Sequence, residues 1–497
     1  MPKRKGKGKS PSASQIKRPK IEHKTVTTTV SEYERKRIEN IRKNNELLAQ
    51  LNIAQAREDL SSFSLTRKPT IKPIRMKVEK VKEDLPRRQS LRIRKIEPDG
   101  ITKLPDPVPS ISTVVQQPRH RGKLEMNAAN DVEEEDSKVF LDELAGLMSK
   151  DTKSITKKNI IIEKTFDSSR YSKLLVKENH VAKVVPQRVY SIQFHSIQSK
   201  ALLFVGDKLG RLGIWDINSK KENNIIIYEP HTKPIINMAF DPEDQTKLVT
   251  ASYDGIIRCA DFSKEVFDEV LALDEDDFYF TYFGFGTPSC HTVLAASSDG
   301  QVRIVDCRKK GHSCPHYQLH DKAIKCLDVN PQRPNMFLTT TNKGQIAIWD
   351  IRNIKGPSSY LSIIERSRSI SSAFFSPQTG QQILATGLDN FVTVNEVSLT
   401  GLISHPPSHM YRHDNFTGRW LATFHAKWDP KNEKYFAIGS MKYPRQLDVF
   451  STERKGGPLI ELWHENFTTI TSRIAFHPTL NIIAGGNSSG KVFVWSE

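Results

Sequence analysis

The sequence of 497 residues predicts an all-β protein, a seven-bladed WD40-type β-propeller that follows a long basic N-terminal region. One short phrase, an alternating apolar run that mostly opens with Gly and closes on Trp-Asp or a similar pair, returns seven times. Its Trp-equivalent positions are 215, 260, 305, 349, 395, 450 and 495, with steps of 45, 45, 44, 46, 55 and 45. A period of about 40–45 residues with a Trp-Asp signature is typical of propeller blades, each of which is a four-stranded sheet.

The upstream half of each repeat predicts a further strand. Apolar and polar residues alternate there until a polar or Pro-containing turn stops the run, which is the pattern of a half-buried β-strand. The runs are VYSIQFH, IINMAFDP, IKCLDVNP, ISSAFFSP and SRIAFHP. Seven such units predict a ring over residues 180–497.

The last repeat is short. The chain stops two residues after Trp495, so this blade lacks an outer strand of its own. Because an open sheet edge invites aggregation, another segment is expected to cover it. The run HVAKVV, at about residues 180–185 and directly before the first repeat, is the expected donor.

The N-terminal region carries all of the chain's net charge. Residues 1–128 hold 31 Lys and Arg against 14 Asp and Glu, so their net charge of +17 equals that of the whole chain. Segments of this composition bury too little apolar surface to offset the entropy of ordering. We therefore expect residues 1–130 to be mostly disordered, with a helix at about 31–53 that a capping box starts. Residues 131–179 are expected to form an acidic, amphipathic linker with a helix at about 136–150.

The charge of this region indicates a polyanionic partner. Neutralising phosphates releases condensed counterions, and nucleic acid is the polyanion that we expect. The alternative is a solvated segment that only carries an import signal, since PKRKGKGK (2–9) and KRPK (17–20) resemble nuclear-localisation clusters. Both interpretations place the protein in the nucleus. No apolar run reaches the about 20 residues needed to span a bilayer, so no membrane partner is expected.

The sequence contains no constellation typical of an enzyme. It has no Gly-rich phosphate loop, no HExxH and no GxSxG in strand-turn-helix context, so we expect no catalytic residue, no cofactor and no small-molecule substrate. The stretch CRKKGHSCPH (307–316) holds residue types that bind zinc, but its spacing is not that of a zinc site, and no metal is expected. His231 begins a repeat, and we expect it to bond Asp254 in the turn of its own blade.

The 55-residue step locates an insertion around HPPSHMYRHDNFTGRW (405–420). Two interpretations remain open. A loop that rises from the ring with aromatic, amide and imidazole groups can stack on bases, at about 1–3 kcal/mol per base, and hold the flanking phosphates. Alternatively, Phe416 and Trp420 pack this loop onto the ring.

The seven repeats, the segment SEYERKRIENIRKN (31–44) and HDNFTGRW (413–420) followed by WDP (428–430) resemble one WD-repeat family. This family contains the small subunit of the UV-damaged-DNA-binding complex, and the sequence is similar to its subgroup of WD repeat-containing protein 76 and the fungal changed-mutation-rate proteins. In the damage-binding relatives a short wedge of aromatic, amide and imidazole side chains enters the DNA at this place, although here the three types are not contiguous. The resemblance implies base-level contact by His413, Asn415, Phe416, Arg419 and Trp420.

The same resemblance implies contacts with the DNA backbone. Arg258 in SYDGIIRCADF and Lys355 in IWDIRNIKG match positions where the relatives present basic side chains to the phosphates. Arg366 and Arg368, in ERSRS, precede a strand of the fifth repeat, and we expect them to reach the same face.

The phrase IWDIR (348–352) resembles a docking box with which such propellers attach to the adaptor of a cullin-4 ubiquitin ligase. The resemblance implies that Trp349, Asp350 and Arg352 bind this partner, with Arg352 at the lower edge of its blade, where it can pair with an acidic group. VDCR (305–308) is a copy of the box without the Trp.

The residues and the resemblance together imply a nuclear DNA-binding WD-repeat protein of DNA metabolism and the damage response. We expect it to bind single- and double-stranded DNA, with a preference for UV-damaged or modified DNA such as DNA with hydroxymethylcytosine. The alternative function is that of a substrate receptor or scaffold of a cullin-4 ubiquitin ligase through the WDIR box. The two functions are compatible, because a damage-binding relative combines both.

Overall fold

The computed structural model describes residues 35, 37–44, 118–130, 134–155, 169–219, 224–273, 277–286, 292–308, 314–418 and 420–497. The chain divides into two compact units, residues 1–109 and 110–497. In the first unit the described residues include a helix at 37–44, which lies within the range 31–53 expected from the sequence. The rest of the basic region up to residue 117 lies outside the described residues.

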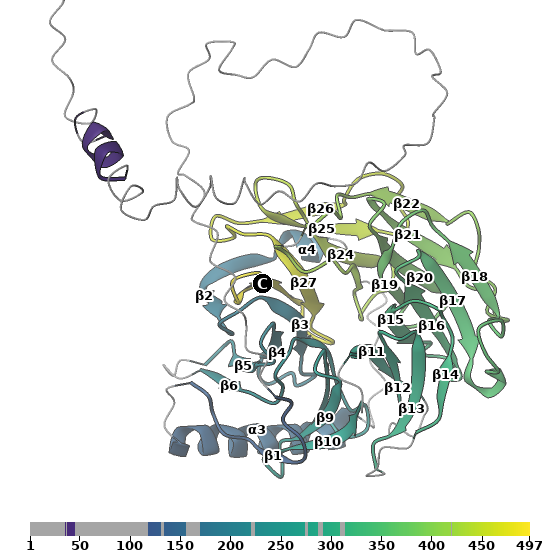
Figure 1. The fold of residues 1–497 in the computed structure, drawn as a ribbon, viewed down its shortest axis with the longest axis horizontal. Helices are drawn as coiled ribbons and strands as arrows, with labels where there is room; N and C mark the ends of the chain where they lie inside the picture. Colours follow the sequence, from purple (N-terminus) through teal and green to yellow (C-terminus); the bar gives the residue numbers. More distant parts are fainter. Residues whose placement is uncertain are drawn as a thin grey trace, which may run out of the picture. The chain divides into compact units, whose positions relative to one another are not determined.

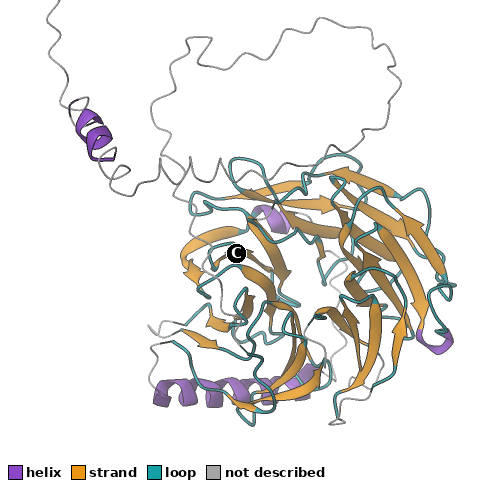
Figure 2. Ribbon diagram, viewed as in Figure 1, coloured by secondary structure: helices purple, strands orange, loops and turns teal. Residues whose placement is uncertain are grey.

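Seven β-sheets of the second unit form a ring, and this confirms the predicted seven-bladed propeller (Figures 1 and 2). Blade 1 has β3 (Val189–Phe194), β4 (Leu202–Asp207), β5 (Leu212–Asp216) and β6 (Ile225–Tyr228), and blade 2 has β7 (Ile235–Phe240), β8 (Lys247–Ser252), β9 (Ile256–Asp261) and β10 (Val266–Ala272). Blade 3 has β11 (Phe280–Phe285), β12 (Thr292–Ser297), β13 (Gln301–Asp306) and β14 (His316–Gln318), and blade 4 has β15 (Ile324–Val329), β16 (Met336–Thr341), β17 (Gln345–Asp350) and β18 (Ser362–Glu365).

The last three blades complete the ring. Blade 5 has β19 (Ile370–Phe375), β20 (Gln382–Gly387), β21 (Phe391–Glu396) and β22 (His409–Arg412), and blade 6 has β23 (Lys427–Trp428), β24 (Tyr435–Gly439), β25 (Gln446–Ser451) and β26 (Ile460–Trp463). Blade 7 has β27 (Thr471–Phe476), β28 (Ile482–Asn487), β29 (Lys491–Ser496) and β2 (Leu175–Lys183). A short 3-10 helix, η1 (Ile351–Asn353), follows β17, and the short helix α4 (Ser169–Ser172) precedes β2.

The repeated phrase forms the turn before the third strand of each blade and that strand itself. Its Trp residues at 215, 349 and 495 are fully buried between neighbouring blades. Its Gly residues at 210, 255, 300, 344 and 490 all have φ between +78° and +88°, a conformation that L side chains rarely adopt. A Cβ at Gly300 would also lie 2.0 Å from the carbonyl oxygen of His320. The turn therefore requires the Gly, and the strand requires the apolar alternation.

Blade 7 joins the two ends of the propeller. Its outer strand is β2, which pairs antiparallel with β29, with Val181 opposite Phe493 and Lys183 opposite Lys491. The backbone N–H groups of Val184 and Val185 then donate to the carbonyl oxygen of Gly490. The stretch 180–185 expected at this edge thus lies along β29, and the strand that contains it begins at residue 175.

A segment before the ring, which we call the strap (residues 118–130 and 134–155), lies against blades 1 and 2 (Figure 1). Its strand β1 (Leu124–Glu125) pairs with β10 as a fifth strand of blade 2. Its helix α3 (Glu134–Ile155) buries Leu141 and Leu144 in the apolar cluster that contains β4, β5 and β7. Residues 118–130, which we expected to belong to the disordered region, therefore bind the ring instead. Only a few apolar side chains make these contacts, and the composition of the region, in which charged residues dominate, does not reveal them.

The ring has two faces that follow from the strand order. Because neighbouring strands are antiparallel, the turns between second and third strands lie at the same end as the connections between blades. We call this end the upper face. The turns between first and second strands and those between third and fourth strands lie at the opposite end, the lower face.

Candidate nucleic-acid interface

The insertion lies at both ends of β22. Residues 413–426 connect blade 5 to blade 6 across the upper face, whereas the corresponding connections elsewhere are as short as 366–369 and 319–323. We call residues 413–426 the long loop. Its side chains alternate: His413, Asn415 and Thr417 are buried, and the residues between them are exposed.

Asn415 fastens the long loop to blade 5. Its side-chain amide donates to the carbonyl oxygen of Gly387 at 2.9 Å, and its backbone N–H donates to Oδ1 of Asn390 at 3.0 Å. Both partners belong to the end of β20 and the turn that follows it. Asn390 itself has a φ of +65°, a conformation that Asn tolerates better than most side chains. The amide is therefore a fixed anchor of the loop.

His413 fastens the same loop to blade 6. Its Nδ1 lies 2.7 Å from Oδ1 of Asn415, and its Nε2 lies 3.8 Å from Oδ2 of Asp448 on β25. The ring also meets Phe424 and Phe450 edge-on, at centroid distances of 5.7 and 6.4 Å. Burial lowers the pKa of this imidazole, so the ring is neutral at physiological pH.

These contacts correct the predicted base-reading set. His413 and Asn415 have almost no exposed surface, so they position the loop and are removed from the candidate base contacts. Phe416 and Trp420 are 71% and 82% exposed, so the alternative that they pack onto the ring is wrong. Arg419 lies outside the described residues.

Sequence reasoning missed an aromatic residue on the neighbouring turn of the upper face. Tyr443, in the turn between β24 and β25, is 88% exposed. The guanidinium of Arg445 lies 5.9 Å from its ring, and Lys442 on its other side is exposed. The signal for this residue is the run MKYPR (441–445), an aromatic residue between cations in a turn, but the run lies outside the insertion that the 55-residue step locates.

Arg258 is not a DNA contact, because it is fully buried. It extends from β9 beneath the strap, where its guanidinium donates to the carbonyl oxygen of Gly122 at 2.6 Å and to that of His120. Burial lowers the pKa of this guanidinium. The position of Arg258 also explains why the strap binds blade 2. The blade alone does not provide all the hydrogen-bond acceptors that this guanidinium needs, and the carbonyl oxygens of the strap supply them.

Arg366 is also a structural residue. Its guanidinium makes two hydrogen bonds of 2.8 Å to the carboxylate of Asp389 and a third to Oγ1 of Thr393 at 3.0 Å. In blade 5 it thus occupies the place that a His occupies in blade 2, and the candidate phosphate contact is withdrawn. The neighbouring Arg368 is exposed on the upper face and has no ion pair among the described residues.

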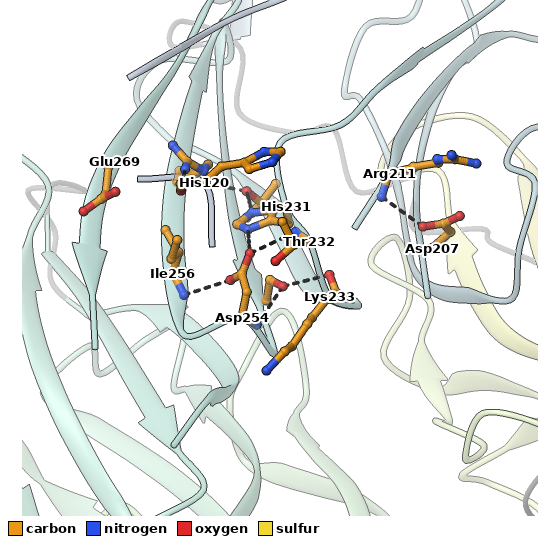
Figure 3. A network of polar contacts seen from close by, with 12 residues as sticks. His120, Asp207, Arg211, His231, Thr232, Lys233, Asp254, Ile256 and Glu269 are labelled. Atoms are coloured by element: carbon orange, nitrogen blue, oxygen red, sulfur yellow. Dashed lines mark hydrogen bonds and ion pairs between the residues drawn. The ribbon is translucent and has the colours of Figure 1, made fainter. Parts of the chain in front are cut away.

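The His of blade 2 confirms the predicted pairing. Nδ1 of His231 lies 2.9 Å from Oδ2 of Asp254 (Figure 3). Its Nε2 lies 2.9 Å from Oγ1 of Thr250. Asp254 also accepts from the N–H of Ile256, which closes the turn before β9. This polar network is buried and holds the blade together.

Lys355 and the WDIR box lie on the lower face. Lys355 is exposed in the connection between β17 and β18, so it faces away from the long loop and cannot contact the same DNA segment. Arg352, in the same connection, is 69% exposed and pairs with both carboxylate oxygens of Asp350, at 3.0 and 2.6 Å. Trp349 is buried, so it packs beneath the WDIR box and cannot contact a partner.

The copy of the box in blade 3 has the same geometry. Arg308 is 63% exposed and pairs with both oxygens of Asp306, at 3.1 and 3.2 Å. Like Arg352, it lies just after the third strand of its blade. Two equivalent guanidinium groups therefore lie on the lower faces of neighbouring blades, although only one follows a Trp.

Replacing Arg258 with Met is expected to release the strap. The variant keeps the apolar stem but loses two hydrogen bonds from a charged donor, each of which contributes about 1.5–3 kcal/mol. Trypsin should then cut at Arg119, Arg121 or Lys123 under conditions in which the unmodified protein is resistant, as mass spectrometry of the digest would show. Arg308→Met, which removes an exposed cation and with it one trypsin site, is the control and should leave the strap as resistant as in the unmodified protein. An equally resistant strap in the Arg258 variant would contradict this role.

Neither a metal site nor a membrane-spanning helix is found among the described residues. No three His, Cys, Asp or Glu side chains gather there as metal ligands, and His312 of the cysteine–histidine stretch lies outside them. No described helix has the length and apolar character of a membrane span.

Comparisons with known proteins agree with this fold. The family described as "WD domain, G-beta repeat" matches residues 222–261. WD repeat-containing protein 76 of Xenopus laevis is 33% identical over 96% of this chain and 83% of its own length, and the mouse protein of that name is 32% identical over 94% and 74%. The DNA damage-binding protein CMR1 of Phaeosphaeria nodorum is 28% identical over 94% and 98%.

A solved structure shows the same fold. The Cps50 (Swd1) β-propeller domain of Myceliophteria thermophila superposes with a TM-score of 0.51 at 16% identity, over 64% of this chain and 99% of that one. Since that identity is low, the likeness concerns the fold alone. The relatives that match along nearly the whole chain are more informative. The chain therefore belongs to the WD-repeat family that includes WD repeat-containing protein 76 and the fungal DNA damage-binding proteins.

Proposed function

We propose that this protein binds DNA in the nucleus and prefers DNA in which base stacking is disturbed. The observation that carries the proposal is the pair of aromatic side chains, Phe416 and Trp420, exposed on a loop that His413 and Asn415 fasten to two blades. Solvent-exposed aromatic rings on a fixed support are suited to stacking on bases. The names of the fungal relatives, DNA damage-binding proteins, support the same function.

Damage selectivity follows from the cost of opening the stack. A ring can stack on a base only where neighbouring bases separate, and this separation costs least at a mismatched, damaged or single-stranded site. UV lesions, modified bases such as hydroxymethylcytosine, and single strands are the ligands that we propose to compare. Arg368, Lys442 and Arg445, on the turns beside the long loop, would hold the phosphates.

The basic N-terminal region supplies affinity of another kind in this proposal. Its charge of +17 over residues 1–128 favours binding to any phosphate backbone through counterion release. Such binding weakens steeply with salt and does not discriminate between sequences. The region therefore raises the affinity, and the upper face sets the preference.

A competition series tests this division. Plain, UV-treated, mismatched, hydroxymethylated and single-stranded DNA would compete for the full chain and for a chain without residues 1–117, at two salt concentrations. We expect the deletion to flatten the dependence of log K on log salt and to leave the ratio between damaged and plain duplex unchanged. If the ratio vanishes with the deletion, the upper face does not discriminate and the proposal is wrong.

A second function has support from the lower face. Two exposed guanidinium groups, Arg352 and Arg308, are held by Asp350 and Asp306 in the same orientation on neighbouring blades. Such planar groups can bind carboxylates with two hydrogen bonds each. We therefore propose that this face docks on the adaptor of a cullin-4 ubiquitin ligase, which would make the protein a substrate receptor or scaffold.

The double variant Arg352→Ala with Arg308→Ala is expected to abolish co-purification with that adaptor. Each single variant should weaken it, because the two groups are equivalent in geometry. Lys355→Ala removes an exposed cation from the same connection as Arg352 and is the matched control. DNA binding should be unchanged in all four variants, since the sites lie on opposite faces. Undiminished co-purification of the double variant would exclude this docking mode.

A further inference from the structure

A cavity opens among the innermost strands of the ring. Its volume is about 40 Å³, which is room for roughly three water molecules. Polar side chains from blades 1, 2, 3, 6 and 7 line it, among them Gln193, Asn237, Tyr282, His425, Lys427 and Arg473. Of these residues, His425 lies at the end of the long loop, and none belongs to the WDIR box.

Two cations of this cavity lack a carboxylate partner among the described residues. Nζ of Lys427 donates to the hydroxyl of Tyr282 at 3.3 Å and lies 3.6 Å from the centre of the Phe374 ring. The guanidinium of Arg473 donates only to backbone carbonyl oxygens, those of Tyr190 at 2.8 Å and Thr423 at 2.7 Å. Neither group forms an ion pair in the described part of the chain, so no Asp or Glu oxygen there lies within 4.0 Å of it.

The surrounding titratable groups do not neutralise these cations. Asp328 is an acid that interacts electrostatically with Lys427, but burial raises its pKa to about 7, and its Oδ2 already accepts from the backbone N–H of Phe375 at 2.7 Å. Burial raises the pKa of Cys326 to about 12 and that of Tyr282 well above its usual value. Burial also lowers the pKa of Lys325, next to Cys326 in the sequence.

The neighbouring groups show that positive charge is in excess. Burial and then the charges of Arg473 and Lys427 hold the pKa of His425 well below 6.5. Burial lowers the pKa of Lys427 to about 8, although Asp328 raises it. Buried charges in proteins are usually paired, since an unpaired buried charge is costly. The cavity thus has the size and the charge for a small anion.

We propose that this central cavity binds a phosphate-type oxyanion between Lys427 and Arg473. Lys427 supplies an ammonium whose remaining hydrogens are free of acceptors in the described chain, and Arg473 supplies a fork of N–H donors. Gln193 and Asn237 also line the cavity, and the amide of Asn237 donates to the carbonyl oxygen of Phe283 at 2.9 Å. Free inorganic phosphate and the terminal phosphate of a DNA strand share this chemistry, and both can be tested.

The test uses the full chain and the anion alone. Sodium sulfate or phosphate, compared with sodium chloride at equal ionic strength, should raise the melting temperature in calorimetry because a ligand of the folded state stabilises it. Lys427→Met keeps the length of the side chain and removes the charge, so it should weaken anion binding at least tenfold. Lys355→Met, on the lower face, should bind as the unmodified protein does. An equal thermal shift with sulfate and chloride, or an undiminished one in Lys427→Met, would overturn the proposal.

The dependence on pH gives a second readout. Sulfate keeps its charge between pH 6 and 9, so a change in its affinity reports on the protein. A bound anion favours protonated Lys427, and binding should therefore be strong below pH about 8 and fall as the pH rises through that value. Asp328→Asn should strengthen binding and move this fall to lower pH, because the charge of Asp328 raises the pKa of Lys427. Affinity that is constant up to pH 9 would contradict the role of Lys427.

Two competitors separate the sources of the phosphate group. A short oligonucleotide with a 5′-phosphate should displace sulfate if DNA ends are the natural ligand, whereas inorganic phosphate alone should do so if the site takes the free ion. The same oligonucleotide without the phosphate should not compete, and competition by it would overturn the assignment. The long loop contributes His425 and the carbonyl oxygen of Thr423 to the site, but Phe416 and Trp420 do not line it, so a variant lacking these two rings should show the same sulfate shift.

Discussion

Replacing both Phe416 and Trp420 with Ala is expected to weaken binding to damaged duplex about 30-fold or more, without lowering the melting temperature. A stacked base contributes about 1–3 kcal/mol, so two lost contacts cost at least about 2 kcal/mol, which is a factor of about 30. Stability should not change because both rings are mostly exposed and leave no hole in the core. Binding to plain duplex should fall much less, because phosphate contacts dominate it.

The measurement is the ratio of dissociation constants for damaged and plain duplex, determined by filter binding at a fixed salt concentration. Tyr360→Ala, which removes an exposed aromatic ring from the lower face, is the matched control and should keep the ratio. Tyr443→Ala tests the neighbouring turn in the same way and should lower the ratio by a smaller factor. A double variant with an unaltered ratio would show that the long loop does not read damage.

Removing residues 175–186 is expected to abolish cooperative folding of the ring. The deletion takes away β2 and with it Val176, Val184 and Val185, which are almost fully buried. Burial of such a side chain stabilises by about 1.5–3 kcal/mol, so the loss of three approaches the about 5–15 kcal/mol that stabilises a typical domain. It also leaves β29 as an open edge, which invites aggregation. Calorimetry should show no cooperative transition, and most of the protein should be insoluble.

Two further variants make this prediction sharp. A chain in which Val176 and Val181 are replaced with Asp keeps its length, so a large loss of stability there would come from lost pairing and packing rather than from a shortened connection. Deleting residues 1–117 removes more of the chain but leaves the strap, and the melting temperature should stay within about 2 °C, since surface changes rarely exceed about 0.5 kcal/mol. A soluble, cooperative protein without β2 would refute the closure of blade 7 as the source of stability.

The propeller was predictable because its information is local and repeated. A turn with positive φ requires the Gly of the repeated phrase, and a strand with two different faces requires its alternation of apolar and polar residues. Each repeat therefore contains the information for its own turn and strand. The strap was not predictable in the same way. Its binding depends on Arg258, more than a hundred residues further along the chain, and composition averages over residues 1–130 conceal Leu124 and Met126.

The candidate site shows the same limit. Imidazole and amide side chains such as those of His413 and Asn415 are suited to contacting DNA, but they are also suited to anchoring a loop from within the protein. The sequence alone does not show that these two side chains are buried. Arg366 has the appearance of a surface cation until its pairing with Asp389 is seen. The cavity with Lys427 and Arg473 was missed because its residues come from blades far apart in the chain, and only the closing of the ring brings them together.

The exposure of Trp420 gives the protein an optical reporter at the place where a base would stack. The indoles of Trp215, Trp349 and Trp495 are enclosed and Trp428 nearly so, which leaves Trp420 and, to a lesser degree, Trp463 in contact with solvent. Red-shifted emission and quenching by iodide should therefore arise mainly from these two. A nucleobase stacked on Trp420 would quench the fluorescence of this residue and shield it from iodide. The fluorescence of the unlabelled protein would therefore report whether DNA is bound.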